Sequence, residues 1–185
     1  FRDNLAEKYK EEAVIKGVDV YDLINEDVKK VPIGSRRLIY LPYLMGERTP
    51  HLNSDCRGVF FGLSAIHNKA DMLRAVMEGV SYSLKDCQGI LQEMKVDISE
   101  MMACGGGGKS PLWRQMLADM YGCEVKTTSS QEGPALGVAI LAGVGAGVFT
   151  DVVSTCREFI NQDTYCQPEA AAHAYYEKGH QLYQK

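Results

Sequence analysis

The sequence predicts an α/β fold. Short apolar or β-prone segments alternate with amphipathic helical patterns, and glycine-rich strand-to-helix junctions occur at residues 104–111 and 128–134. In open α/β sheets, ligands bind at the carboxyl ends of the strands. We therefore expect these junctions to form opposite walls of a single pocket.

Composition narrows the class of protein. The chain has 185 residues, 45% hydrophobic and 24% charged, which is typical of a globular domain, and we expect a single domain over residues 1–185. A net charge of −4 gives no basic field for nucleic acid or an acidic membrane. No apolar run approaches the roughly 20 residues that cross a bilayer, and no signal peptide is recognisable. We expect a cytoplasmic protein that binds neither nucleic acid nor membrane.

The cysteines and the N-terminus add further expectations. The six cysteines show no C-x-x-C pair and no metal-ligand spacing, which favours core thiols in a reducing compartment. Those expected in or beside apolar elements are Cys87, Cys104 and Cys123. The chain begins in what reads as the middle of a helix, without an initiator methionine, so we expect a fragment of a longer protein.

The first third of the chain predicts helices, a strand and a polar loop. A helix over residues 1–16 ends at Gly17, a shorter helix covers 21–30, and a buried strand covers 38–41. The loop that follows is rich in polar side chains, and ordered polar loops often carry function. Glu47, Arg48 and His51 are therefore candidate functional residues; the alternative is that an Arg48–carboxylate pair holds the loop to its own domain.

A β-prone segment at residues 58–63 precedes a long predicted helix at 69–95. The helix carries an apolar stripe at i, i+3, i+4 and i+7 spacing, which indicates a core face and not a cofactor groove. The stripe consists of Leu73, Val76, Met77, Val80, Leu84, Cys87, Ile90, Leu91 and Met94. Glu78, Lys85 and Glu93 are expected on its solvated side.

The next segment is the most informative in the chain. An apolar run ending at Cys104 meets four consecutive glycines, Gly105–Gly108, and Lys109 and Ser110 follow before a helix. Because glycine loses the most backbone entropy on ordering, such a run suits bare backbone against which a flat ligand lies. Ser110 is a good N-cap and Pro111 a good first helical residue, so the positive end of the helix faces the turn. This pattern favours a nucleotide site.

This segment has two other interpretations. A Walker A loop is disfavoured, because Ala103 stands at its first glycine position and Pro111 disfavours the α conformation at Ser110. A structural turn without a ligand remains an alternative. Trp113 and Arg114 lie in the first helical turn; Arg114 either faces a phosphate or adenine or forms a surface ion pair.

The last third predicts a strand near a sheet edge at 123–128 and a helix from Pro134 whose small residues imply close packing by another element. Helices are also expected at 151–160 and 168–184. His173, Glu177 and His180 share a face of the last helix. Exposed histidines are common there and no third strong ligand is nearby, so we assign no metal site.

Three motifs together resemble the FGGY family of carbohydrate kinases. They are Gly58-x-Phe60-x-Gly62-Leu63 with Asp71-Met72-x-x-Ala75-Val76-Met77-Glu78; Cys104 to Ser110 with Trp113, Gln115 and Ala118-Asp119; and Glu132-Gly133-Pro134-Ala135-Leu136-Gly137. Within the family, Gly46-Glu47-Arg48-Thr49-Pro50-His51 is most similar to the xylulokinases.

The resemblance implies the ribonuclease-H-like fold of the actin, hexokinase and Hsp70 ATPases, in which two such domains flank a cleft. The chain would be most of the second domain without its first strands. The cofactors implied are ATP and Mg²⁺. The adenine and ribose would lie against Gly105, Gly106, Gly107 and Ser110, with Gly108 and Lys109 less firmly placed.

The reaction implied is phosphorylation of a ketopentose, with D-xylulose giving D-xylulose 5-phosphate. The catalytic base and most sugar contacts would lie outside this chain, so we assign no catalytic residue and expect the fragment alone to be inactive. A homodimer is compatible with the resemblance. The alternatives are a kinase for gluconate or ribulose, and a non-catalytic actin-like nucleotide-binding module.

Overall fold

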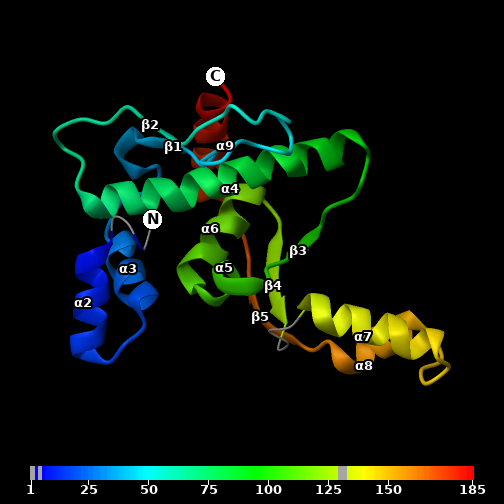
Figure 1. The fold of residues 1–185 in the computed structure, drawn as a ribbon. Coiled ribbons are helices and arrows are strands. Elements are labelled where there is room, and N and C mark those ends of the chain that lie inside the picture. Colours follow the sequence, from blue (N-terminus) through cyan, green and yellow to red (C-terminus); the bar gives the residue numbers. More distant parts are fainter. Residues whose placement is uncertain (1–2, 4–5, 129–132) are drawn as a thin grey trace. The chain divides into compact units, whose positions relative to one another are not determined.

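The computed structural model describes residues 3, 6–128 and 133–185. The chain forms two compact units: residues 1–96 with 170–185, here unit 1, and residues 97–169, here unit 2. Figure 1 shows the elements of each unit. Among the described residues, no helix is long and apolar enough to cross a membrane.

Unit 1 is built around one long helix. Its elements are α2 (Glu7–Lys16), α3 (Val20–Lys29), the 3-10 turn η1 (Ser35–Arg37), β1 (Ile39–Leu41), β2 (Val59–Phe61), α4 (Lys69–Glu93) and α9 (Ala170–Tyr183). Strands β1 and β2 pair antiparallel. As predicted, Gly17 ends α2 in the left-handed conformation, with a φ of 66°.

The sequence of α4 explains both its start and its packing. Asn68 caps the helix in a capping box with Asp71, which satisfies the otherwise free N–H groups of the first turn. Gly79 lies against β1 so closely that a Cβ there would overlap the carbonyl of Tyr40. Around this contact lie the buried side chains Leu38, Tyr40 and Ala75.

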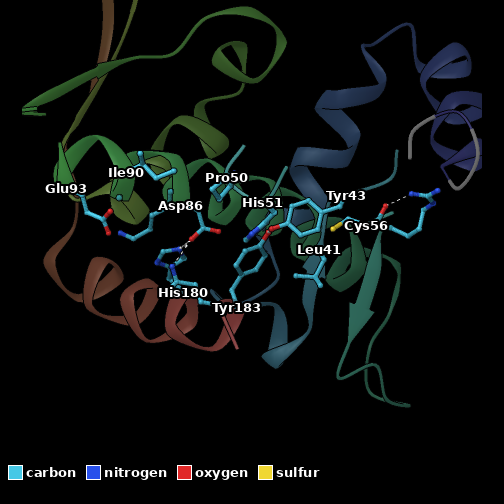
Figure 2. Close-up of a pocket in the computed structure, with 14 residues that line it drawn as sticks. Leu41, Tyr43, Pro50, His51, Cys56, Asp86, Ile90, Glu93, His180 and Tyr183 are labelled. Carbon is cyan, nitrogen blue, oxygen red and sulfur yellow. Dashed lines mark hydrogen bonds and ion pairs between the residues drawn. The ribbon is translucent and has the colours of Figure 1, made fainter. Parts of the chain in front are cut away.

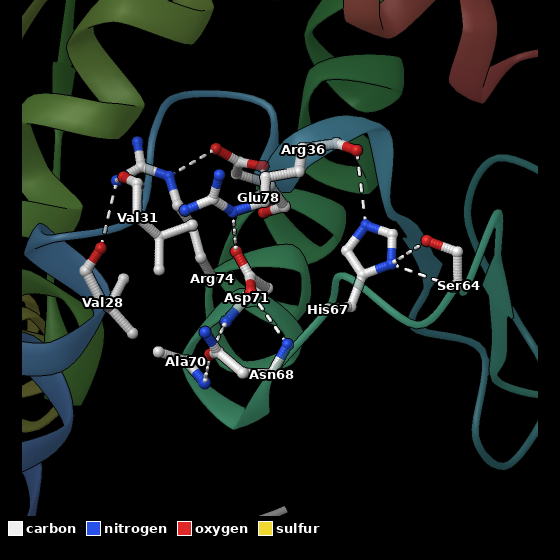
Figure 3. Close-up of polar contacts among 11 residues, drawn as sticks. Val28, Val31, Arg36, Ser64, His67, Asn68, Ala70, Asp71, Arg74 and Glu78 are labelled. Atoms are coloured by element: carbon white, nitrogen blue, oxygen red, sulfur yellow. Dashed lines mark hydrogen bonds and ion pairs between the residues drawn. The ribbon is translucent and has the colours of Figure 1, made fainter.

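A buried carboxylate, that of Glu78, joins α4 to the turn before β1 and to α9. Figure 3 shows its contact with Arg74 of the same helix. It accepts hydrogen bonds from Gly34 N (2.9 Å), Ser35 Oγ (2.7 Å), Arg74 Nε (2.8 Å) and the Tyr176 hydroxyl (3.2 Å). Burial raises the pKa of Tyr176, and the charge of Glu78 adds to this, so the phenol keeps its proton and donates. The carboxylate is therefore fully engaged.

The segment that Glu78 holds is strained. Ser35, Arg36 and Arg37 have positive φ values of 47°, 53° and 72°, a conformation that non-glycine residues rarely adopt. A second carboxylate, that of Asp71, is also buried and pairs with Arg36 Nε at 2.9 Å. Glu78 and Asp71 thus fix this left-handed turn onto α4 (Figure 3).

The expectation of a solvated side on α4 is wrong for two of its three residues. Glu78 is 2% and Lys85 is 9% exposed, because α9 and the turn before β1 cover that side and supply their partners. Glu93 is exposed as expected. The apolar stripe is buried at Leu73 and Met77, but four of its later members are exposed: Leu84, Ile90, Leu91 and Met94.

Helix α9 packs on the same helix. Tyr176 and Tyr183 are buried, and Lys85 of α4 pairs with Glu177 of α9. One helical turn further along, His180 Nε2 lies 2.7 Å from Asp86 Oδ1. Two of the three residues that share a face of the last helix, Glu177 and His180, therefore join α9 to α4.

Unit 2 is a three-stranded sheet with flanking helices. Its elements are β3 (Glu100–Met102), α5 (Gly105–Lys109), α6 (Pro111–Tyr121), β4 (Glu124–Thr128), α7 (Gly133–Gly145), α8 (Val152–Phe159) and β5 (Gln162–Cys166). The strand order is β3-β4-β5, with β3 and β4 parallel. The prediction that residues 123–128 lie near an edge is wrong for the described sheet, because β5, a strand not predicted from the sequence, pairs on the other side of β4.

Helix α7 contains four glycines, and a Cβ would meet a neighbour at two of them, Gly133 and Gly143. A Cβ at Gly143 would overlap the ring of Phe149, whereas a Cβ at Gly137 or Gly145 would meet nothing within 4 Å among the described residues. Among the described residues, the predicted close packing is therefore present at Gly143 and absent at Gly137 and Gly145.

The Glu78 network leads to a stability prediction. Glu78→Gln replaces one acceptor oxygen by a donor amide and leaves Arg74 buried without its counter-charge, so we expect a loss of about 3–5 kcal/mol in the free energy of unfolding. Urea unfolding followed by far-ultraviolet circular dichroism measures it. Glu93→Gln, on the exposed side of the same helix, is the control and should change stability by less than about 0.5 kcal/mol. Equal effects of the two substitutions would contradict the structural role of Glu78.

Candidate nucleotide site and a second cavity

The carboxyl ends of β3 and β4 lie at the same edge of the sheet, because the two strands are parallel neighbours. A helix follows each strand: α5 begins at Gly105 and α7 at Gly133. A Cβ placed on Gly133 would lie 4.0 Å from the Cys104 sulfur. The structure thus brings the two predicted junctions together; residues 129–132, including Glu132 of the third motif, lie outside the described residues.

The four glycines form a tight helical turn and not an open loop. At two of these positions, the fold itself favours or requires glycine. Gly105 has a φ of +72°, which favours glycine, and Gly108 is buried so that a Cβ there would lie 2.7 Å from the Ala103 carbonyl oxygen. Cys104, expected in an apolar environment, is exposed at the start of this turn.

The other two glycines have no such explanation. Gly106 is exposed and a Cβ there would meet nothing within 4 Å, while a Cβ on Gly107 would make an ordinary 3.5 Å contact with the Trp113 ring. Glycine in a helix costs about 1 kcal/mol relative to alanine. The fold therefore tolerates side chains at both positions; the main chain of Gly106 is open to a ligand, and Gly107 is half-buried beside the Trp113 ring.

Residues of the first turn of α6 stabilise the glycine turn. Ser110 accepts a hydrogen bond from Trp113 N at 3.2 Å and Pro111 takes the first helical position, as predicted. Arg114 Nη1 donates to the Gly108 carbonyl at 2.6 Å. Among the described residues it makes no ion pair, so the expected surface pair is wrong; the side chain clamps the turn instead. Lys109 is exposed at the end of the turn.

In unit 1, the candidate loop folds mostly on itself. The Glu47 carboxylate accepts from the main-chain N–H groups of Arg48 (2.7 Å) and Thr49 (3.0 Å), so it caps its own loop. Arg48 is exposed and pairs with no carboxylate among the described residues, so the alternative of an ion pair anchoring the loop is wrong. His51 packs edge-on against Tyr43, with ring centroids 5.5 Å apart.

This loop forms one wall of a cavity of about 690 Å³, whose other walls are α4 and α9 (Figure 2). His51 lines the cavity together with the Asp86–His180 pair and with Tyr43 and Tyr183, whose hydroxyls are 2.8 Å apart. Among the described residues, no group of three or more His, Cys, Asp or Glu side chains is placed to hold a metal ion. His173, the remaining residue of the metal face considered above, lies 3.9 Å from Glu177.

Comparison with known proteins settles the family. A model of the FGGY family of carbohydrate kinases, C-terminal domain, matches residues 3–146. The chain belongs to the FGGY family of carbohydrate kinases.

The relatives found include two kinds of sugar kinase. The chain is 40% identical over 152 residues to a xylulose kinase of Staphylococcus epidermidis (strain ATCC 12228 / FDA PCI 1200), covering 82% of this chain and 31% of that protein. It is also 40% identical over 147 residues to a gluconokinase of Bacillus subtilis (strain 168), covering 79% of this chain and 29% of that protein. This FGGY chain thus spans about a third of the length of its relatives.

Solved structures confirm the predicted α/β class and the ATPase-like fold. A ligand-bound xylulose kinase from Lactobacillus acidophilus matches with a TM-score of 0.82 and 32% identity, over 91% of this chain and 34% of that one. A gluconate kinase from the same species matches with a TM-score of 0.81 and 32% identity, over 90% and 33%. The resemblance to the FGGY kinases drawn from the sequence motifs is confirmed.

The glycine turn leads to a paired stability prediction. Gly108→Ala should lower the free energy of unfolding of unit 2 by about 1–3 kcal/mol, because its methyl group collides with main chain. Gly106→Ala should instead raise it by about 0.5–1 kcal/mol, because the methyl group meets open space and favours the helix. Urea unfolding followed by the fluorescence of Trp113, the single tryptophan, reports on this unit. A loss of stability in Gly106→Ala would show that the fold requires that glycine too.

Proposed function

We propose that this chain supplies the adenine and ribose side of the cleft of an ATP-dependent sugar kinase. The supporting observation is that the fold does not require glycine at residues 106 and 107, which follow the carboxyl end of β3. No side chain of these two residues therefore covers the main chain there. In this proposal the purine lies against Gly105, Gly106 and Gly107, and Ser110 approaches the ribose. The placement of Gly108 and Lys109 near the ligand is part of the same proposal.

The contribution of the chain is to position the nucleotide. Transfer of the γ-phosphoryl group to a sugar hydroxyl depends chiefly on alignment and charge neutralisation. The Arg114–Gly108 hydrogen bond and the Trp113 contact would keep the glycine turn rigid, so that little ordering remains to be done when the ring binds. We assign no catalytic base to this chain, and closure against the sugar-holding part of the protein would exclude water.

Magnesium would enter with the nucleotide. Because no group of three or more possible metal-binding side chains lies among the described residues, we assign no Mg²⁺ ligand to this chain and derive no step from one. Mg²⁺ would neutralise phosphate charge during transfer.

For the substrate we propose a ketopentose, D-xylulose, with D-xylulose 5-phosphate as the product and most sugar contacts in the remainder of the protein. The Gly46 to His51 motif supports this choice. Gluconate is the second candidate, because a gluconokinase relative reaches the same 40% identity as a xylulose kinase. A non-catalytic nucleotide-binding module is the remaining alternative, and a homodimer of the whole protein stays a proposal.

The nucleotide site is tested by Gly106→Val in the full-length protein. Branched methyl groups would occupy the face on which the purine lies, so we expect the dissociation constant for ATP to rise at least about tenfold by calorimetric titration. Gly145→Val, also in open space in unit 2, is the matched control and should leave affinity unchanged. Unchanged ATP affinity in Gly106→Val would remove the turn from the site.

The substrate is tested by steady-state kinetics of the full-length protein on xylulose, ribulose, gluconate and glycerol. We expect kcat/KM to be highest for xylulose, and we expect the 185-residue chain alone to give no turnover because the proposed catalytic base lies elsewhere. A higher kcat/KM for gluconate would replace the proposed substrate. Turnover by the chain alone would refute the proposed division of labour.

A further inference from the structure

A groove between the β1–β2 hairpin and α9, here called the hairpin groove, has a volume of about 940 Å³, within the range of small-molecule sites. In β2, Phe60 packs on the core and its ring lies 4.6 Å from that of Tyr40, centroid to centroid. Side chains alternate between the two faces of a strand, so the neighbours of Phe60 in β2 point away from the core and into the groove. The hairpin residues of this face that line the groove are Ile39, Leu41, Val59 and Phe61.

One side of α9 forms the facing wall. Tyr175, Gly179 and Leu182 follow one another at i, i+4 and i+7 spacing and all line the groove, so they share a face of the helix. Leu182 is 53% exposed and Phe61, from the hairpin, is 70% exposed. Large apolar side chains that gather around one hollow and stay in contact with water are typical of a binding site. The hairpin groove therefore offers apolar walls on two sides to a bound molecule.

The charged residues that line the groove are mainly basic. They are Arg36, Arg37, Lys178 and Lys185, with Glu78 as the carboxylate among the described residues. Glu78 is already paired with Arg74, and Arg36 is paired with Asp71. In the part of the chain that the structure describes, the other three basic side chains are exposed and pair with no carboxylate. The groove thus presents net positive charge that the protein itself does not neutralise.

His67 also lines the groove, and its hydrogen bonds fit the neutral ring. Its Nδ1 lies 3.0 Å from the main-chain nitrogen of Ser64, and because an amide N–H only donates, this ring nitrogen accepts. The ring proton is therefore on Nε2, which donates to the Arg36 carbonyl at 3.3 Å (Figure 3). The imidazole joins the loop after β2 to the turn before β1, and the positive charge of the groove comes from arginine and lysine.

Apolar walls beside unneutralised basic groups match a molecule that has both an apolar and an anionic part. A small inorganic anion would leave the apolar walls in water, and a neutral hydrocarbon would leave the basic groups without a partner. We propose that the hairpin groove binds an amphiphilic carboxylate, with one anionic head on an unbranched hydrocarbon chain. The hydrocarbon lies between Phe61 and Leu182, and the head lies near Lys178 and Arg37. Because the two apolar walls face each other, the groove admits a single chain and not a flat bilayer.

The ligand class is tested by calorimetric titration of the full-length protein with three probes. Dodecanoate, kept below the concentration at which it forms micelles, has both parts of the proposed ligand. Acetate has the head alone, and dodecyltrimethylammonium has the same chain with the opposite charge. We expect saturable binding of dodecanoate at one site, no detectable binding of acetate, and a dissociation constant at least about tenfold higher for the cation.

Two substitutions of exposed side chains, each with a matched control in α2, locate the site. Lys178→Glu places negative charge beside the head, and Phe61→Gln removes apolar surface from one wall; each should raise the dissociation constant for dodecanoate about tenfold. Lys8→Glu changes the net charge equally and Ile15→Gln removes an equally exposed apolar side chain, and both should leave the affinity unchanged. Circular dichroism checks that all four variants are folded.

Five results would each overturn the proposal. They are no saturable binding of dodecanoate, equal affinity for the cation, an unchanged affinity in Lys178→Glu or in Phe61→Gln, an equal loss in the control variants, and co-sedimentation with phosphatidylglycerol vesicles in place of dodecanoate binding. The last result would make this face a membrane-binding surface. No readout involves ATP or a sugar, so the outcome is independent of the proposed kinase function.

Discussion

The carboxylate of Glu78 is the constraint on which unit 1 depends. It is buried in the middle of α4, where a charge is stable only with close partners, and it receives four donors from the turn before β1, from its own helix and from α9. Through Ser35 it stabilises a left-handed turn that the chain would otherwise avoid. The hydrogen bonds of Glu78 therefore hold the turn before β1, α4 and α9 together. Helices α4 and α9 are two of the walls of the cavity in this unit.

Unit 2 uses its glycines in two different ways. At Gly105 the backbone conformation favours glycine and at Gly108 the close approach of Ala103 requires it, whereas Gly106 and Gly107 meet no such demand. A run of four identical residues thus divides into a structural pair and a pair that exposes main chain. Arg114 donates a hydrogen bond to the carbonyl of Gly108, and this contact holds the turn that contains Gly106 and Gly107 in a fixed position. The nucleotide proposal depends on this division.

The sequence predicted what local chemistry determines and missed what tertiary contacts determine. Capping by Ser110, the stop at Gly17, the length of α4 and the two strand-to-helix junctions follow from residue type and spacing, and all are present. The sequence predicts Glu78 in solvent because a carboxylate on a helix usually is, and its donors outside α4 lie 43, 44 and 98 residues away. Strand β5 was missed because its residues are polar and mostly exposed. Nothing in residue spacing signalled the cavity: its walls come from three separate segments, although His51 was among the predicted candidates.

The proposed nucleotide site depends on a purine ring lying on bare main chain at the glycine turn. The decisive test is a crystal structure of the full-length protein with Mg²⁺ and a non-hydrolysable ATP analogue. We expect the base to lie in van der Waals contact, about 3.5–4 Å, with the main chain of Gly106 and Gly107. A base bound elsewhere, with these two glycines still facing solvent, would contradict it.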